Sequence, residues 1–373
     1  MTNLFKIKAV ILLAAIFLLS SCSLPIFKIP NTKVIYKDLF TQSGLLEMSI
    51  KSKGFGKNVD INESTIIASY NKGAYIFQKG GLSWYQEKNI ILDDSIQTYD
   101  VAISENCAII SFLDKTNAKE SIAIYKKNGT DWEIDTSLIR PIGNQYHGFG
   151  RSIDVCDNDI IVSTENGVTL IYSLLTSGWE TAEEFYTDTL ESDIYGSNSR
   201  NSHVKIINDK AFIYMLNQIS ILEKSGKNWE SKKNLVTNSE ESFYGEGASL
   251  GCNDNRFIWT PEFTMDVSSK DIFIYHLSDI GWEKDTTLSL RTNFGYETDI
   301  AMTDSHIVSC IRTSWIDDCT DICFLTHNNN VWSETERLRL PLDFGKEISA
   351  SNEFSVFSGN SSIYVYNMKK LGQ

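Results

Sequence analysis

The residues of this chain that could perform chemistry are seven cysteines, five histidines and several adjacent acidic pairs. The histidines are widely separated along the sequence: His147, His203, His276, His306 and His327. The sequence contains no Gly-x-Ser-x-Gly elbow, no His-Glu-x-x-His motif and no glycine-rich phosphate loop. Paired carboxylates can perform acid–base chemistry on sugars, but adjacent acidic residues in turns of so acidic a chain are more typical of solvated surface. The sequence therefore favours a non-catalytic protein without a cofactor, and leaves a polysaccharide-active enzyme as an alternative.

The cysteines beyond the N-terminal segment predict at most one disulfide. Three of them are interpreted as buried small hydrophobic residues: Cys107, Cys156 and Cys252. Cys310, Cys319 and Cys323 lie on one predicted hairpin, and we expect one bridge there, Cys310–Cys323 or Cys319–Cys310. No second pair of ligands has the spacing of a zinc finger, so the sequence predicts no zinc site.

Six tryptophans recur at intervals of 47 to 53 residues: Trp84, Trp132, Trp179, Trp229, Trp282 and Trp332. A period of this length is typical of repeat architectures. Each tryptophan follows a turn that contains Gly or Asn, and short runs of β-branched and aromatic residues lie upstream of it. Each unit therefore predicts four antiparallel strands, as in the blade of a β-propeller. A residue that recurs once per blade at one place is expected to pack the blade rather than bind a ligand.

The number of blades follows from the period. The mean interval is 49.6 residues, and residues 34–373 comprise 340 residues, close to seven units. The last unit, from Phe344 to Tyr366, has three strands, and Leu45 to Ile50 can supply the fourth. We therefore predict an all-β, seven-bladed propeller of four-stranded antiparallel blades, closed by the N-terminal strand so that no sheet edge is left free.

An aromatic residue followed by glycine begins many of the units: Gly54-Phe55-Gly56, Gly148-Phe149-Gly150, Tyr195-Gly196, Tyr244-Gly245, Phe294-Gly295 and Phe344-Gly345. With the tryptophan period, this pattern resembles the FG-GAP-like repeats of integrin-α type β-propellers. The resemblance implies the fold. It does not extend to that family's calcium loop, because the nearest match, Asp154 to Asp159, lacks the glycine and no segment offers six to eight oxygen ligands in order.

The N-terminus has the features of an export signal. Lys6 and Lys8 precede an apolar run from Ala9 to Leu19, which is too short for a dedicated membrane span. The sequence Leu19-Ser20-Ser21-Cys22 resembles the lipobox of bacterial lipoproteins, and this resemblance implies lipid attachment at Cys22. We therefore expect a signal peptide at residues 1–21, a tether at 22–33, a propeller domain at 34–373, and a lipid-anchored location in the bacterial envelope outside the cytoplasm, in the outer membrane of a diderm cell.

Two tryptophans outside the period indicate a contact surface. Trp259 and Trp315 adjoin or lie in two long loops between the second and third strands of neighbouring units. Function concentrates in such loops. The binding surface that we predict comprises Trp315, Phe263, Met265, Asp317 and Asp318.

The charge of the chain limits its partners. The formal net charge is −14, and removal of residues 1–21, with two lysines and no acidic residue, makes it −16. A domain this acidic repels phosphate backbones, so nucleic acid is not an expected partner. We interpret the chain as a monomeric, envelope-anchored binding or scaffold lipoprotein for a protein or glycan partner. An outer-membrane assembly factor is a further alternative beside the polysaccharide-active enzyme.

Overall fold

The computed structural model describes residues 35–40, 45–81, 83–186, 203–215, 218–236, 249–260, 269–291, 298–312, 319–329, 331–341, 344–359 and 361–371. All of them belong to one compact unit, Val34–Gln373. Regular structure in these ranges is almost entirely β-strand, and the helical segments within them are two short 3-10 turns, η1 (Asn144–Tyr146) and η2 (Met368–Lys370). None of the helices in these ranges is long and apolar enough to cross a membrane.

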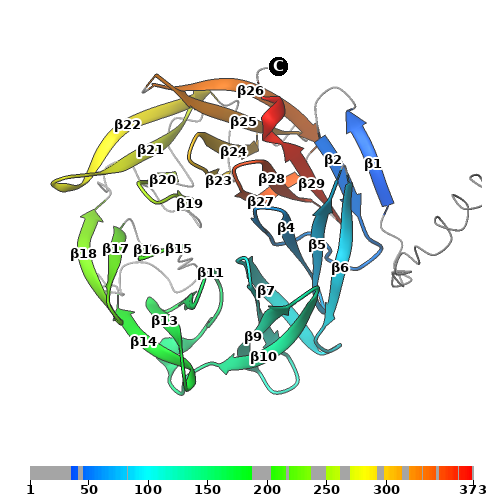
Figure 1. Cartoon of the computed structure of the whole chain (residues 1–373), viewed down its shortest axis with the longest axis vertical. Helices are drawn as coiled ribbons and strands as arrows, with labels where there is room; N and C mark the ends of the chain where they lie inside the picture. Colours follow the sequence, from blue (N-terminus) through cyan, green and yellow to red (C-terminus); the bar gives the residue numbers. More distant parts are fainter. Residues whose placement is uncertain are drawn as a thin grey trace, which may run out of the picture. The chain divides into compact units, whose positions relative to one another are not determined.

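Six four-stranded antiparallel sheets follow one another around a ring (Figure 1). The first blade contains β3 (Val59–Asn62), β4 (Thr65–Tyr70), β5 (Gly73–Gly80) and β6 (Ser83–Ile91). The second contains β7 (Ile96–Ile103), β8 (Cys107–Asp114), β9 (Lys119–Asn128) and β10 (Asp131–Ile139). The third contains β11 (Ile153–Cys156), β12 (Asp159–Ser163), β13 (Val168–Leu175) and β14 (Gly178–Tyr186).

The next three blades repeat this order. The fourth contains β15 (His203–Ile207), β16 (Lys210–Met215), β17 (Gln218–Ser225) and β18 (Asn228–Val236). The fifth contains β19 (Ser249–Cys252), β20 (Arg256–Thr260), β21 (Ser269–Ser278) and β22 (Gly281–Arg291). The sixth contains β23 (Thr298–Met302), β24 (His306–Arg312), β25 (Cys319–Asn328) and β26 (Val331–Pro341).

The seventh blade joins the two ends of the domain. It is built from β27 (Phe344–Ala350), β28 (Phe354–Gly359), β29 (Ser362–Asn367), β2 (Leu45–Ser49) and β1 (Ile35–Phe40). Strand β2 pairs antiparallel with β29, from Leu45 opposite Tyr366 to Ser49 opposite Ser362. The predicted seven-bladed propeller, closed by its N-terminal strand, is therefore confirmed. Strand β1 is an addition that the prediction lacked, because it extends the closing blade beyond its fourth strand.

A bulge recurs at one place in the first six blades. Three residues after each periodic tryptophan, one residue of the outer strand has no partner in the register with the third strand. These extra residues are Glu87, Asp135, Ala182, Lys232, Asp285 and Thr335. Because a bulge increases the local twist of a strand pair, the repeat bends each outer edge in the same way.

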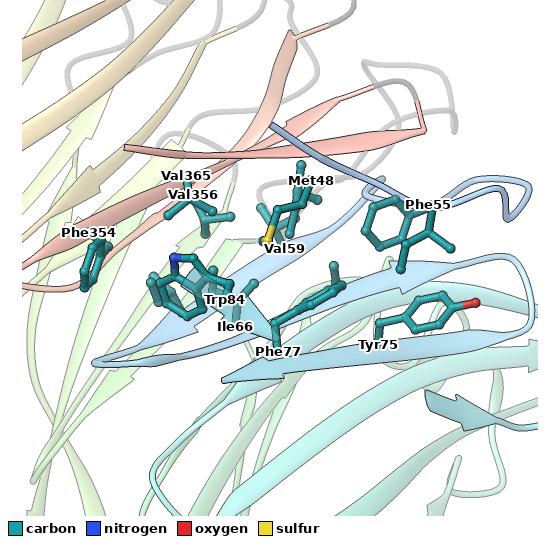
Figure 2. Packing of buried hydrophobic residues seen from close by; sticks show 14 of the residues in the cluster. Met48, Phe55, Val59, Ile66, Tyr75, Phe77, Trp84, Phe354, Val356 and Val365 are labelled. Atoms are coloured by element: carbon teal, nitrogen blue, oxygen red, sulfur yellow. The ribbon is translucent and has the colours of Figure 1, made fainter. Parts of the chain in front are cut away.

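The periodic tryptophans pack between adjacent blades, as predicted. Trp84 is 3% exposed and meets Phe354 of the closing blade edge-on, with ring centroids 5.3 Å apart. Figure 2 shows this cluster, in which Trp84, Phe77 and Met48 come from the first and closing blades. Two tryptophans also donate their indole N–H to the preceding blade's bulge residue: Trp132 to Glu87 at 2.9 Å and Trp179 to Asp135 at 3.0 Å.

Candidate functional site: the central channel

The innermost strand of a blade uses its side chains to bind the backbone of the next blade. Asp60 Oδ2 accepts the Ile103 N–H of β7 at 2.7 Å. At the equivalent register position of the third blade, Asp154 Oδ2 accepts the Ile206 N–H of β15 at 2.9 Å. The same structural role therefore recurs at two places around the ring.

A second level of such contacts lies two residues earlier on these strands. Asp100 Oδ2 accepts the Ile153 N–H at 3.0 Å, and Glu347 Oε2 accepts the Val59 N–H at 3.2 Å. Three further pairs of this kind are Ser152 with Val204 N–H at 3.3 Å, Ser249 with Ile300 N–H at 3.0 Å and Asp299 with Ile348 N–H at 2.5 Å.

These hydrogen bonds satisfy backbone N–H groups at the inner edges of the sheets, in the centre of the ring. The inner edge of each sheet would otherwise present unpaired backbone N–H groups, and buried backbone donors need acceptors. Short carboxylate and hydroxyl side chains of the neighbouring blade provide them. The central carboxylates therefore act as structural acceptors that join blade to blade.

Lys205 of β15 lies close to these carboxylates. In the described part of the ring, it is the one innermost-strand lysine that does so. Its ammonium lies 4.0 Å from Asp154 Oδ2, and its side chain is 35% exposed. Burial opposes the charge on Lys205, but the carboxylates of Asp154 and Asp60 more than offset this and raise its pKa above the usual value. Lys205 is therefore a fixed cation at the centre of the ring.

One lysine does not neutralise the surrounding acids. Burial raises the pKa of Asp100 to about 7, and burial raises that of Asp154 to about 6 although Lys205 opposes the shift. Burial also raises the pKa of Asp299, and it raises that of Glu347 well above the usual range, with Asp100 and Asp299 adding to the effect. The centre of the ring therefore has more buried carboxyl groups than positive charge to balance them.

The channel opens into a cavity of about 810 Å³ at one face of the ring. Its walls are the ends of all seven innermost strands and the turns that lead to the second strands. Among the described residues that line it, seven are acidic and two, Lys127 and Lys205, are basic. Aliphatic side chains alternate with the polar ones, for example Ile103, Val155 and Ile206.

The mouth of this cavity carries an acidic rim. The equivalent turn position of every blade is an acid or an amide: Glu63, Glu105, Asp157, Asn208, Asp254, Asp304 and Asn352. The two amides donate to their neighbours, Asn208 to Asp254 and Asn352 to Asp304, the latter at 3.5 Å. In the first three blades, Glu63, Glu105 and Asp157 face solvent.

The predicted loop surface lies outside the described residues. This applies to Phe263, Met265, Trp315, Asp317 and Asp318, and equally to the predicted lipid site Cys22. Trp259, at the end of β20, is described and is a packing residue. It is 5% exposed and stacks on Phe273 with ring centroids 4.5 Å apart.

The predicted Cys310–Cys323 bridge is not formed in the structure. Cys323 is a free thiol that packs between the fifth and sixth blades, whereas Cys310 packs between the sixth and seventh. Neighbouring residues on paired strands point to opposite faces, and Cys310 lies opposite Ile322, one position away from Cys323. The Cys319–Cys310 alternative involves a side chain outside the described part.

The histidines do not form a common site. His147 Nδ1 contacts Glu165 Oε2 at 2.9 Å, while the His327 ring packs on Trp332 with centroids 4.7 Å apart. His203 lies near the channel, where burial lowers its pKa to about 4, with Lys205 adding to the effect. Within the described ranges, no group of three or more His, Cys, Asp or Glu residues could hold a metal ion.

The channel residues were not singled out in the sequence. Their signal was a positional one: the residue three places before the acid or amide of each turn is Asp in two blades and Lys in a third, and this becomes visible only when the blades are aligned. Taken singly, Asp60, Asp154 and Lys205 look like ordinary polar residues at strand ends.

Comparison with known proteins supports the propeller class and goes no further. No family model matches the chain, and no curated protein sequence matches it. A Lactobacillus plantarum protein of solved structure has a TM-score of 0.54 and 10% identity, covering 83% of this chain and 95% of that one. A candidate 6-phosphogluconolactonase from Bacteroides uniformis has a TM-score of 0.57 and 10% identity, covering 77% and 84%.

A chain of the mitotic checkpoint complex is equally similar, with a TM-score of 0.57 and 8% identity over 90% of this chain and 99% of that one. At such low identity these likenesses establish the fold alone. The class of protein that the fold and the comparisons define is a seven-bladed β-propeller.

Proposed function

We propose that this chain is a binding or scaffold module of the bacterial envelope, held outside the cytoplasm by a lipid on Cys22. The observation that carries the proposal is the use of the central carboxylates. Asp60, Asp100 and Asp154 each accept a backbone N–H from the next blade, which makes the ring a rigid platform. A platform with an open cavity at one face is suited to hold a protein or glycan partner.

The location rests on the N-terminal sequence. Lys6, Lys8, the apolar run and Leu19-Ser20-Ser21-Cys22 fit a lipoprotein signal. Labelling cells with a clickable palmitate analogue tests this part. We expect label on the full chain and none on Cys22→Ala, and equal labelling of both forms would contradict it.

An enzyme is the second candidate, because four channel carboxyls have raised pKa values and two structural neighbours bear a lactonase description. The acidity of the cavity argues against a phosphorylated lactone as substrate, since its lining residues would repel an anion. The structural use of the carboxylates also argues against acid–base chemistry by them.

A crosslinking experiment tests the binding function. A photocrosslinking amino acid is placed in intact cells at Glu63 on the cavity rim, at Trp315 on the predicted loop surface, or at Glu283 on an outer strand as control. We expect a discrete adduct from one ring face and none from the control. Recovery of the outer-membrane barrel-assembly machinery would favour the assembly-factor alternative.

The enzyme alternative has its own test. The purified chain is assayed with 6-phosphogluconolactone and with envelope polysaccharides, beside Asp154→Asn. Turnover by the full chain that Asp154→Asn abolishes while the fold is retained would overturn the binding proposal.

A further inference from the structure

The cavity at the ring centre has a charge that selects its ligand. Seven acidic and two basic side chains line it among the described residues, and one of the two, Lys127, already lies 3.6 Å from Glu87 outside the cavity. Low-dielectric walls focus such a field into the opening. Anionic ligands are therefore disfavoured and cationic ligands are attracted.

The protein itself shows how the site holds an ammonium group. The side chain of Lys205 lines the cavity, and its ammonium lies 4.0 Å from Asp154 Oδ2. Carboxyl groups of Asp60 and Asp154 face it, and those of Asp100, Asp299 and Glu347 lie at the other level, on the innermost strands of three other blades. One internal cation is thus set among five carboxyl groups.

The walls of the cavity also suit a ligand whose charged groups are separated by methylene chains. Ile103, Val155 and Ile206 line the cavity between the acidic positions, and methylene chains pack on aliphatic surface while their charged ends stay among polar groups. At the mouth, Glu63, Glu105 and Asp157 are exposed on three consecutive blades. No aromatic side chain lines the cavity among the described residues, so the stacking surface typical of sugar sites is missing.

We propose that the cavity binds a linear ligand with several ammonium groups separated by methylene chains. The rim carboxylates receive the outer ammonium groups, and the channel carboxyls beside Lys205 receive the leading one. Free polyamines and lysine-rich peptide ends share this chemistry. This inference rests on the proposed binding function and names the ligand class of its site.

Titration calorimetry on the detergent-solubilised full chain tests the proposal. The probes are spermine and pentalysine, with maltotriose and glutamate as neutral and anionic controls. Binding is expected at about 20 mM salt and should weaken strongly at about 200 mM, because the contacts are exposed charges. Binding by spermine alone assigns a free polyamine, and binding by pentalysine alone or more tightly assigns a peptide end.

Matched variants locate the site. The rim variant Glu63→Gln/Glu105→Gln/Asp157→Asn should bind about tenfold more weakly, from three lost exposed charge contacts. The control variant Glu133→Gln/Glu283→Gln/Asp285→Asn removes three exposed acids from outer strands and should bind as the unaltered chain does. Circular dichroism confirms that both variants fold.

Proton release on ligand binding provides an independent measurement. A cation beside Asp154, which lines the cavity, favours the charged form of that carboxyl, so binding at pH 6.5 should release protons, detected by comparing buffers of different ionisation enthalpy. Failure of both polycations to bind, equal binding by rim and control variants, or preferential binding of maltotriose or glutamate overturns the proposal. If crosslinking from the ring face still succeeds in that case, the binding function stands and the ligand class is wrong.

Discussion

Replacing Asp60 with alanine should weaken the joint between three blades. The Asp60 side chain is 8% exposed. Its Oδ2 accepts the Ile103 N–H of the second blade at 2.7 Å, and its Oδ1 accepts the Ser349 hydroxyl of the seventh blade at 2.6 Å. Asp60→Ala removes both acceptors and leaves both donors in place.

The magnitude follows from the number of orphaned groups. A buried donor left without a partner costs about 1–3 kcal/mol. Two such donors, with some access of cavity water to each, give an expected loss of about 3 kcal/mol in the free energy of unfolding. Asp60→Asn keeps one acceptor oxygen, so it should lose about half as much.

Urea unfolding followed by tryptophan fluorescence measures this loss. The matched control is Asp285→Ala, an exposed bulge residue of an outer strand, which should change stability by less than about 0.5 kcal/mol. A double-mutant cycle of Asp60→Ala with Ser349→Ala should show coupling, because the two side chains share a hydrogen bond. If Asp60→Ala were as mild as Asp285→Ala, the structural role given to the central carboxylates would be refuted.

Three further predictions concern other parts of the ring. Burial raises the pKa of Asp100 to about 7, above its unfolded value near 4, so the stability that this group contributes is present below about pH 4 and is lost as pH rises to about 7. The urea midpoint of the unaltered chain relative to Asp100→Asn should therefore fall between about pH 4 and pH 7. A constant difference over this range would contradict the prediction. Glu87→Ala removes the acceptor of the Trp132 indole N–H and should lower the free energy of unfolding in urea by about 1–2 kcal/mol. The control is Lys232→Ala, at the equivalent bulge of the blade before Trp282, whose indole N–H has no hydrogen-bond partner; it should lower that free energy by less than about 0.5 kcal/mol. Equal effects of the two substitutions would refute the role of the Trp132–Glu87 hydrogen bond. Gly150→Ala places a Cβ 2.7 Å from Ser111 Cβ at a φ of +87° and should lower the thermal unfolding midpoint markedly. Gly226→Ala, at a φ of +65° with open space around the new Cβ, should lower the free energy of unfolding by only about 1 kcal/mol. A larger loss of stability in Gly226→Ala than in Gly150→Ala would contradict the packing.

The repeat could be predicted from sequence because one residue type marked it. A tryptophan every 47 to 53 residues, preceded by a turn, sets the blade length, and the blade length sets the count of seven. The closing strand Leu45–Ser49 followed because the last unit lacked its fourth strand. These features depend on local pattern and on arithmetic, so they need no knowledge of tertiary contacts.

The channel could not be predicted in the same way. Asp60, Asp154 and Lys205 are 51 or more residues apart and meet only when the ring closes. The bulge residues Glu87 and Asp135 likewise gain their role from the next blade's tryptophan. The Cys310–Cys323 pairing was proposed from proximity on one hairpin, but strand register, which places the two side chains on opposite faces, was not visible in the residue spacing.

Hydrogen–deuterium exchange of the inner-strand amides tests most directly whether side chains of one blade close the edge of the next. The amide N–H groups of Ile103, Ile153 and Ile206 donate to Asp60, Asp100 and Asp154 rather than to water, so they should exchange as slowly as the sheet interior. In Asp60→Ala, protection should fall at Ile103 and persist at Ile206. Fast exchange of all three amides in the unaltered chain, or unchanged protection of Ile103 in Asp60→Ala, would contradict the account.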